Sequence, residues 1–213
     1  FVVIVFIFAT LVIDIITVLF VYFLFLNFWV VFHAFFTYSI IFRLSKLNPY
    51  IFFIKMRETM LFAFSTSSSS ATMPITLKTV EEKLGVGKSV GSFCVPLGAT
   101  INMDGTAIIQ RVATVFIAQA FSVDLSFSEY LMVILTATLA SIGTAGVPGV
   151  GLIMLAMVLQ QVGLPVEGIA LIIGVDRLLD MIRTAVNVSG DAMVSCIVAN
   201  SENELHEATF NKV

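Results

Sequence analysis

The feature that most constrains this sequence is its long apolar stretches. From Phe1 to Phe42 the only charged residue is Asp14. At about 1.5 Å per residue, one helix over this run would be about 63 Å long, twice the ~30 Å hydrocarbon core of a bilayer. We therefore expect a membrane helix from Ile15 to Phe42 and a break near Asp14, with the part before it ending a preceding span. Candidate residues at the membrane interface are Tyr22, Trp29 and Tyr38.

Composition supports a membrane protein. Hydrophobic residues make up 59% of the 213 residues and charged residues 12%, about half the ~25% of an ordinary soluble domain. The net charge of -3 includes no basic block, which argues against nucleic-acid binding. Cys94 and Cys196 form no CxxC pair, and His33 and His206 lack a metal-ligand spacing, so we assign no role to these four residues. Because the chain enters an apolar run at once, we expect it to be the C-terminal part of a longer protein.

Three further apolar regions cover residues 90–121, 130–162 and 169–199, and each contains a polar or glycine-rich cluster that we expect to interrupt it. Lipid offers no hydrogen-bond partner, so backbone groups freed by such breaks must bond within the protein or bind ions. Interrupted helices of this kind point to a substrate or ion site near the midplane of a transporter. The clusters are Gly98–Thr106, Ser141–Gly151 and the series Asp176, Asp180, Arg183, Asn187 and Asp191.

Two segments have the pattern of hairpins that enter the membrane and turn back. Residues 50–84 place Ser65–Thr72 between two short apolar arms, and residues 130–162 flank the glycine-rich cluster. No arm reaches the ~20 residues of a full span. A flexible soluble linker is the alternative for the serine run, but its apolar flanks favour a hairpin tip.

Positive charge predicts the side from which each hairpin enters. Of the 11 Lys and Arg residues, seven lie between Arg43 and Lys88, and none lies between Val112 and Asp176. Because cytoplasmic loops carry the excess of Lys and Arg, the first hairpin is predicted to enter from the cytoplasm and the second from outside. Such an inverted pair is typical of alternating-access transporters.

Polar and ionisable residues in the last apolar region, Asp176, Asp180, Arg183 or Thr184, Asn187 and Asp191, recur every three or four positions, which places them on one helix face. Surplus carboxylates on that face favour cations, and sodium, like other hard cations, takes oxygen ligands. Arg183 can be neutralised by Asp180 in a structural pair or can bind a ligand carboxylate through its planar fork. An intramembrane aspartyl protease would use two aspartates as a dyad. It is disfavoured because Asp176 and Asp180 lie one turn apart and Arg183 would keep Asp180 ionised.

Four motifs resemble those of the dicarboxylate/amino acid:cation symporters, the glutamate transporter family. They are TSSSSATMPIT at 66–76, PLGATINMDGTA at 96–107, ASIGTAGVPG at 140–149 and DRLLDMIRTAVNVSGD at 176–191. They occur in the family's order, and the resemblance covers about residues 45–200. It implies an all-α membrane protein made of transmembrane helices and two re-entrant helical hairpins with interrupted helices.

The resemblance also implies a division of the chain. Residues 1–44 would be a transmembrane helix region holding the end of the scaffold and the sixth helix, and 201–213 a polar cytoplasmic tail. Residues 45–200 would form the transport core, and the resemblance implies that the family's first four spans would lie outside this sequence. The implied parts of the core are hairpin 1 at about 50–84, a seventh helix at about 90–121, hairpin 2 at about 130–162 and an eighth helix at about 169–199.

The resemblance implies residue roles as well. Arg183 would bind the substrate's side-chain carboxylate and Asp180 its amino group. The other implied substrate contacts are Ser68, Ser69, Thr106, Val147, Gly151, Thr184 and Asn187. The implied sodium ligands are Gly98, Asn102, Asn187 and Asp191 for one ion, Thr100, Ser141, Ile142 and Thr144 for a second, and Asn102 and Asp104 for a third.

The function implied by the resemblance is sodium-coupled symport of glutamate and aspartate by an elevator-type mechanism. The protein would be a multi-pass homotrimer in the plasma (cytoplasmic) membrane, within the lipid bilayer, with sodium as coupling ion, no other cofactor and no enzymatic activity. A proton-coupled glutamate/aspartate or C4-dicarboxylate carrier of the same fold is the alternative. The chain departs from the family at Ser67 and Met181, where many archaeal and animal members, respectively, have an arginine. These departures leave the counter-transported ion open.

Overall fold

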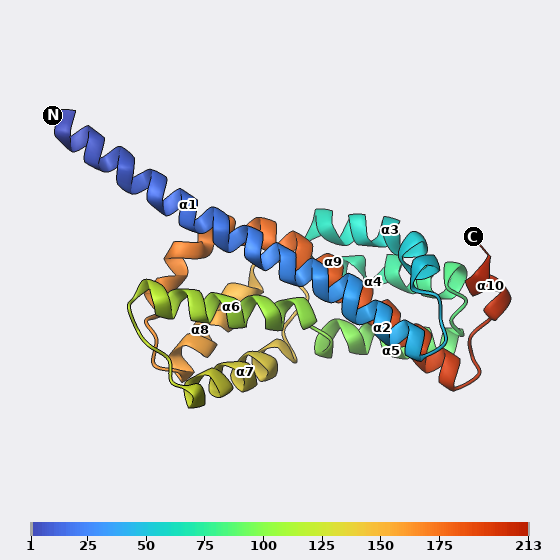
Figure 1. Cartoon of the computed structure of the whole chain (residues 1–213). Coiled ribbons are helices and arrows are strands. Elements are labelled where there is room, and N and C mark those ends of the chain that lie inside the picture. Colours follow the sequence, from blue (N-terminus) through green and yellow to red (C-terminus); the bar gives the residue numbers. More distant parts are fainter. Residues whose placement is uncertain (1, 213) are drawn as a thin grey trace.

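The computed structural model describes residues 2–212, with side chains from residue 12 onward. Within this part the chain is all-helical, and its one β-type pairing is an isolated bridge between Val86 and Leu205. Long helices lie side by side along one axis, and the N-terminal helix extends beyond the others (Figure 1).

A continuous helical rod forms the N-terminal part. It consists of α1 (Val2–Phe32), a π-helical turn (His33–Thr37) and α2 (Tyr38–Leu44). The predicted break near Asp14 was wrong. No glycine or proline interrupts the rod, and Asp14 is exposed on its surface, so its carboxylate does not disturb the backbone. Val12–Leu44 is the one stretch in the described part that is long and apolar enough to cross a bilayer by length and composition.

The rod also corrects the expected interface residues. Tyr22 and Tyr38 are buried against the other helices, whereas Trp29 is exposed. Tyr22 packs on Phe116 with 4.5 Å between ring centroids. Both tyrosines therefore belong to the protein core.

Helix α3 (Pro49–Thr66) and helix α4 (Ser69–Lys78), which continues into a π-helical turn (Thr79–Lys83), form the first helical pair. Asn48 caps α3 by accepting from the Tyr50 amide at 2.9 Å. At the other end Ser67 has a φ of 51°, in the left-handed region, and Ser68 caps α4. The turn thus needs two residues, and most of the serine run is helical.

Helices α5 (Lys88–Ile101) and α6 (Asp104–Ala120) follow each other end to end across a short break, and α7 (Phe127–Ser141) and α8 (Val150–Gln161) pack side by side as a second helical pair. Asn102 and Met103 leave the helical region between α5 and α6. Residues 142–149 join α7 to α8, and the turns at Gly143 and Gly149 require φ values of 81° and 78°, which glycine adopts without strain.

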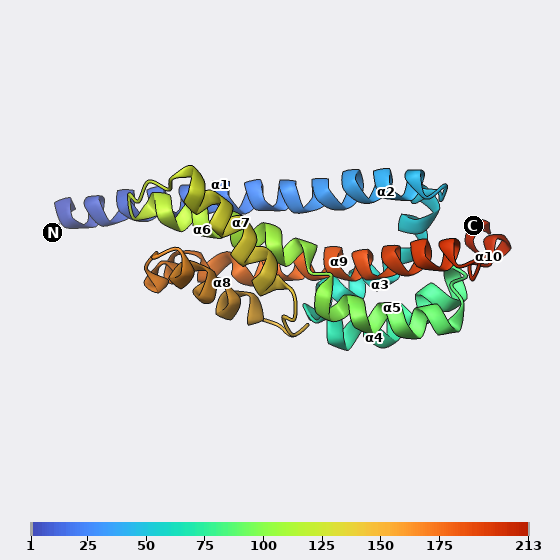
Figure 2. The same ribbon diagram turned by 90° about the horizontal axis from the view of Figure 1, so that it is seen from below.

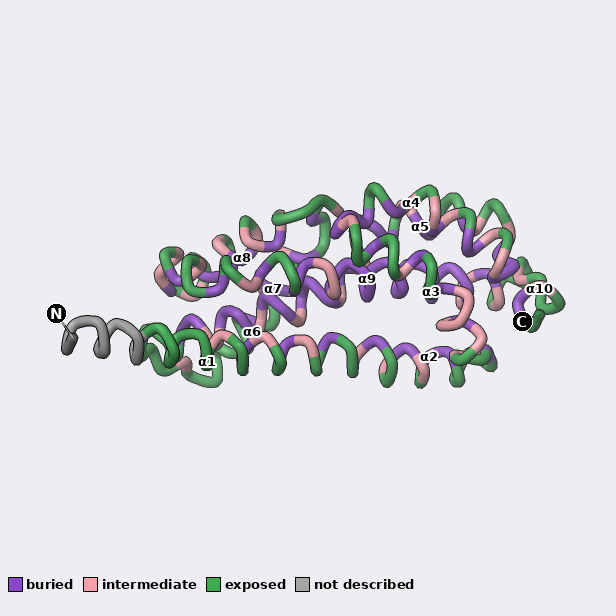
Figure 3. The backbone as a smooth tube through the Cα atoms, turned by 90° about the horizontal axis from the view of Figure 1, so that it is seen from above, coloured by how far each residue is buried: buried purple, intermediate pink, exposed green. Residues whose placement is uncertain are grey.

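A short 3₁₀ turn (Val166–Gly168) leads into α9 (Ile169–Ser201), which lies against α1, α3, α5 and α6. Figure 2 shows α9 between the rod on one side and α4, α5 and α8 on the other, with α6 lying next to the rod. Its polar residues do not interrupt it, which corrects the expectation of a break in this region. Residues 183–193 of α9 are all buried, while the exposed surface lies on the outer helices (Figure 3).

The C-terminal residues fold back and make backbone contacts with the connection between the first helical pair and α5. The Gly87 amide donates to the Glu204 carbonyl and the His206 amide to the Gly85 carbonyl, each at 2.8 Å. After these contacts, α10 (Glu207–Asn211) buries Phe210. The Lys55 ammonium donates to the carbonyls of Lys83, Thr209 and Phe210 at 2.7–2.8 Å and fixes this segment in place.

Candidate functional site

Three interruptions meet beside the middle of α9. They are the first tip (Ser67 and Ser68, between α3 and α4), the 142–149 segment between α7 and α8, and the α5–α6 break. The Ser68 hydroxyl donates to the Gly146 carbonyl at 2.7 Å, and the Ser70 amide donates to the same carbonyl at 3.1 Å. The Gly143 amide donates to the Thr100 carbonyl at 2.6 Å. The 142–149 segment therefore bridges the first tip and the end of α5 over the polar face of α9.

Arg183 and Asp180 form the charged centre of this region. They are 4% and 2% exposed, and the Arg183 guanidinium donates to Asp180 Oδ1 at 2.5 Å. Asp180 Oδ2 accepts from the Gly149 amide at 2.9 Å. A buried ion pair requires further hydrogen bonds, and here the Gly149 amide of the 142–149 segment donates one. Arg183 lies so close to Gly151 that a Cβ there would collide with the guanidinium.

A cavity of about 10 Å³ lies at this pair, room for no more than one water molecule. It collects side chains and tip backbone from α4, α6, α8, α9 and the 142–149 segment. Seven of the nine substrate residues implied by the resemblance line it: Ser69, Thr106, Val147, Asp180, Arg183, Thr184 and Asn187. The other two lie next to it: Ser68 holds Gly146, and Gly151 packs on Arg183.

Ser67 and Met103, for which no substrate contact is predicted, also line this cavity. The Ser67 hydroxyl is buried and has no hydrogen-bond partner. Met103 Sδ accepts from the Asn187 amide nitrogen at 3.2 Å. Both residues lie where a helix is interrupted, Ser67 between α3 and α4 and Met103 between α5 and α6. The predicted interruptions in these two motifs were the only feature of the sequence that could have pointed to them.

Asn187 fixes the start of α6. Its side-chain oxygen accepts from the Gly105 amide at 2.9 Å, and its nitrogen donates to the Thr106 hydroxyl at 3.2 Å. Asn187 and Thr106 are both buried. These bonds satisfy a free amide at the beginning of α6.

Asp191 forms a second polar group one turn along α9. Asn102 donates to its Oδ1 at 2.9 Å and lies 3.4 Å from the Asn187 carbonyl. A Cβ on Gly98 would lie 2.6 Å from Asp191 Oδ1, so the close packing requires glycine. The structure thus brings together the four implied ligands of one sodium ion, and their amide, carbonyl and carboxylate oxygens suit a hard cation.

The other implied sodium ligands are less closely grouped. Ser141 and Thr144 are buried, while Thr100 and Ile142 are exposed; the Gly143–Thr100 backbone bond holds this group together. Asn102 and Asp104 face different partners, because Asn102 bonds to Asp191 whereas Asp104 bonds to the rod. In the described part of the chain, no three His, Cys, Asp or Glu side chains gather as a metal site.

Asp104 receives two contacts that sequence analysis did not predict. His33 Nε2 lies 3.2 Å from Asp104 Oδ2, and the Tyr38 hydroxyl donates to the same oxygen at 3.1 Å. Both residues come from the rod, some 70 positions away in sequence. No motif marks them, so only the folded structure links them to Asp104.

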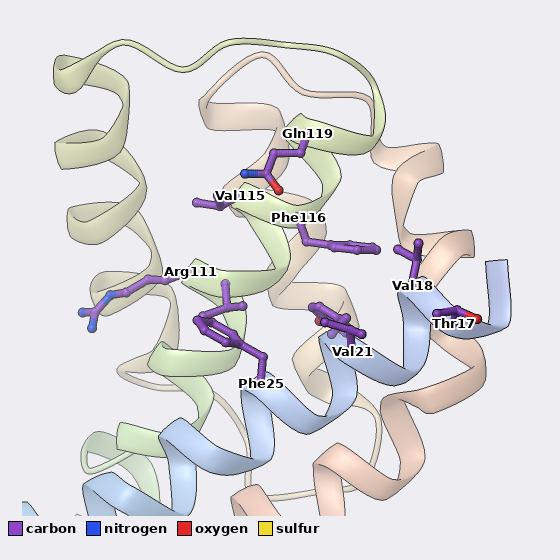
Figure 4. Close-up of a pocket in the computed structure, with 10 residues that line it drawn as sticks. Thr17, Val18, Val21, Phe25, Arg111, Val115, Phe116 and Gln119 are labelled. Carbon is purple, nitrogen blue, oxygen red and sulfur yellow. The ribbon is translucent and has the colours of Figure 1, made fainter. Parts of the chain in front are cut away.

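A larger cavity of about 620 Å³ lies away from this polar centre, between α1 and α6. Figure 4 shows that its labelled lining side chains are mostly apolar, and that Arg111 extends away from α1. Arg111 bonds to the Thr138 hydroxyl of α7. The size of this cavity does not mark it as the site, because the convergent polar groups lie at Asp180 and Arg183.

Comparison with known proteins places this arrangement in context. A family model described as the sodium:dicarboxylate symporter family matches residues 1–201. An excitatory amino acid transporter of Caenorhabditis elegans is 54% identical over 159 residues, which are 75% of this chain and 32% of that protein.

Vertebrate proteins also match this chain. Excitatory amino acid transporter 3 of Oryctolagus cuniculus is 50% identical over 169 residues, 79% of this chain and 32% of that protein. Excitatory amino acid transporter 1 of Rattus norvegicus is 47% identical over 165 residues, 77% of this chain and 30% of that protein. The chain thus spans about a third of the length of these relatives.

Proposed function

Because this chain belongs to the sodium:dicarboxylate symporter family, we propose that it forms the substrate-binding core of a sodium-coupled carrier for glutamate and aspartate. Its relatives are transporters by name, and the resemblance drawn from the four motifs is confirmed at the level of the family. The observation that carries the proposal is the buried Arg183–Asp180 pair beneath two helix tips.

Arg183 specifies an acidic ligand in this proposal. Its guanidinium binds a carboxylate through two parallel hydrogen bonds, and Asp180 pairs with the ligand's ammonium. A plain C4-dicarboxylate has no ammonium, so it would leave Asp180 without a cationic partner. For an amino acid to enter the present cavity, the 142–149 segment must move away and release Asp180 from Gly149.

Sodium stabilises the loaded site in this proposal. Asp191 and Asn102 would bind one ion with the Gly98 and Asn187 carbonyls, and the ion would fix Asn187 next to the substrate. Ser141, Ile142, Thr144 and Thr100 would bind a second ion where the 142–149 segment meets α5. Sodium at that position would hold the segment closed, so transport would require both ligands.

The proposal includes the membrane arrangement. The α3–α4 and α7–α8 pairs would be re-entrant hairpins that enter from opposite sides, and the core would move as an elevator in a homotrimeric, multi-pass protein of the plasma membrane. Short arms, of 10 residues in α4 and 12 in α8, support hairpins over full spans. The proposed protein also contains membrane helices beyond those described.

The proposal is tested by aspartate uptake into liposomes that contain the full-length protein, with an inward sodium gradient, with equal sodium, and with choline in its place. We expect uptake that follows the sodium gradient. Uptake driven by a proton gradient without sodium would support the proton-coupled carrier instead. Absence of aspartate uptake under every gradient would contradict both.

A further inference from the structure

The π-helical turn of the rod brings two donors to one oxygen of Asp104. Asp104 lies at the start of α6, at the α5–α6 break, and its side chain is 35% exposed. His33 is the first residue of the turn and Tyr38 directly follows it, and both contact Oδ2. An ionised carboxylate only accepts hydrogen bonds, so the hydrogen lies on His33 Nε2.

The turn is what allows two residues five positions apart to share this target. In a regular α-helix each residue advances by about 100°, so side chains at positions i and i+5 point about 140° apart. A π turn closes i to i+5 hydrogen bonds and so widens the helix, which brings side chains at these two positions closer to the same face. His33 and Tyr38 therefore face Asp104 together because the rod is widened at this point.

We propose that His33 and Tyr38 are positioning residues for a coupling cation at Asp104, an inference that rests on the proposed function. The two donors fix Oδ2 and set the orientation of the carboxylate. Oδ1 accepts no hydrogen bond from the described part of the chain and remains available to ligate the ion. A carboxylate held at one oxygen loses less conformational freedom when it binds the cation, so affinity for the cation rises.

Tyr38 also connects this carboxylate to the substrate site. Its hydroxyl lies 3.3 Å from the Val186 carbonyl of α9, and Val186 precedes Asn187. A hydroxyl carries one hydrogen, so Tyr38 donates either to Asp104 or to Val186. The Tyr38 hydroxyl therefore lies within reach of both the carboxylate that would hold the cation and the α9 backbone next to Asn187.

The experiment measures the sodium concentration for half-maximal aspartate uptake, and the KM for aspartate at saturating sodium, in the full-length protein. Tyr38→Phe removes one hydroxyl and His33→Leu removes the ring donor, whereas His33→Gln keeps a donor at similar reach. Tyr22→Phe is the matched control, because Tyr22 is buried on the same rod and its hydroxyl has no partner.

We expect Tyr38→Phe and His33→Leu each to raise the half-maximal sodium concentration about tenfold, because each removes a hydrogen bond to a charged group. The KM for aspartate at saturating sodium should stay within about twofold of wild type. His33→Gln should recover most of the sodium affinity, and Tyr22→Phe should match wild type. Thermal unfolding in detergent confirms that each variant is folded.

The outcomes separate this inference from the proposed function. Unchanged sodium dependence in Tyr38→Phe and His33→Leu would overturn the positioning role while leaving sodium-coupled transport intact. An equal shift in Tyr22→Phe, or no recovery in His33→Gln, would mean that the rod acts only through stability and would also overturn it. Sodium-independent uptake by wild type would overturn the proposed function, and the inference with it.

Discussion

Replacing Arg183 by cysteine tests the site most directly, because it separates stability from recognition. In wild type the guanidinium lies 2.5 Å from Asp180 Oδ1, and both side chains are almost fully buried. Arg183→Cys leaves Asp180 with the Gly149 amide and a long contact to the Thr184 hydroxyl at 3.5 Å. Breaking a buried pair in this way costs about 3–5 kcal/mol.

A second variant separates the two effects. Asp180→Asn combined with Arg183→Cys removes both charges, so we expect it to recover most of the stability lost by Arg183→Cys alone. It should not recover aspartate binding, because no cation remains for the side-chain carboxylate. A loss of about 3 kcal/mol in the free energy of aspartate binding would lower the affinity more than a hundredfold, since each 1.4 kcal/mol is tenfold.

The assay combines unfolding in detergent with calorimetric binding of aspartate, and of alanine as a neutral ligand, at saturating sodium in the full-length protein. Arg183→Cys should lose aspartate binding and gain measurable binding of alanine. Wild-type aspartate affinity in Arg183→Cys would refute the assignment of Arg183 to the substrate. Unchanged stability in Arg183→Cys would refute the reasoning about the buried pair.

Three further predictions follow from contacts elsewhere. Gly98→Ala places a methyl group against Asp191 and should raise the half-maximal sodium concentration for aspartate binding by about tenfold, measured by sodium titration; an unchanged value would remove Asp191 from the ion site. Lys55→Met removes the ammonium that holds three carbonyls and should speed proteolytic cleavage after Ser201 without changing aspartate affinity; equal cleavage rates would contradict the role of Lys55. Ser126→Ala removes the α7 cap and should lower stability by about 1 kcal/mol. Hydrogen bonds from the Ser126 hydroxyl and backbone lower the pKa of Glu129. The part of the difference that comes from the hydroxyl's bond to the Glu129 carboxylate is therefore present at neutral pH and is lost as the pH falls through that lowered pKa, whereas the hydroxyl still accepts from the Glu129 amide. Thermal unfolding between pH 7 and pH 3 should show the difference between the two proteins narrowing, and a constant difference would contradict this reasoning.

Much of the polar centre could be predicted because its residues lie in short motifs. Asp180, Arg183 and Asn187 recur at helical spacing, and the structure places all three at one cavity. Spacing along a helix is a local property, so the sequence alone could place these residues on one face. The substrate and ion roles of these residues remain predictions.

Other features depended on contacts that leave no local pattern. The expected break near Asp14 was based on the thickness of a bilayer. That thickness limits how much of a helix can lie inside the membrane, but it does not stop the helix from continuing beyond the membrane. The π turn at His33 contains no glycine or proline that could mark it. The docking of the C-terminal residues uses backbone groups of Gly85 and Gly87, and backbone hydrogen bonds do not depend on a recognisable side-chain sequence.

The bridge from Ser68 and Ser70 to the Gly146 carbonyl has a consequence for binding kinetics. With this bridge in place the cavity admits one water molecule at most, so ligand cannot collide directly with Arg183. At low aspartate the observed binding rate should rise in proportion to concentration. At high aspartate it should level off at the opening rate of the 142–149 segment, so the breaking of the hydrogen bonds that hold this segment sets the upper limit on how fast the protein can load.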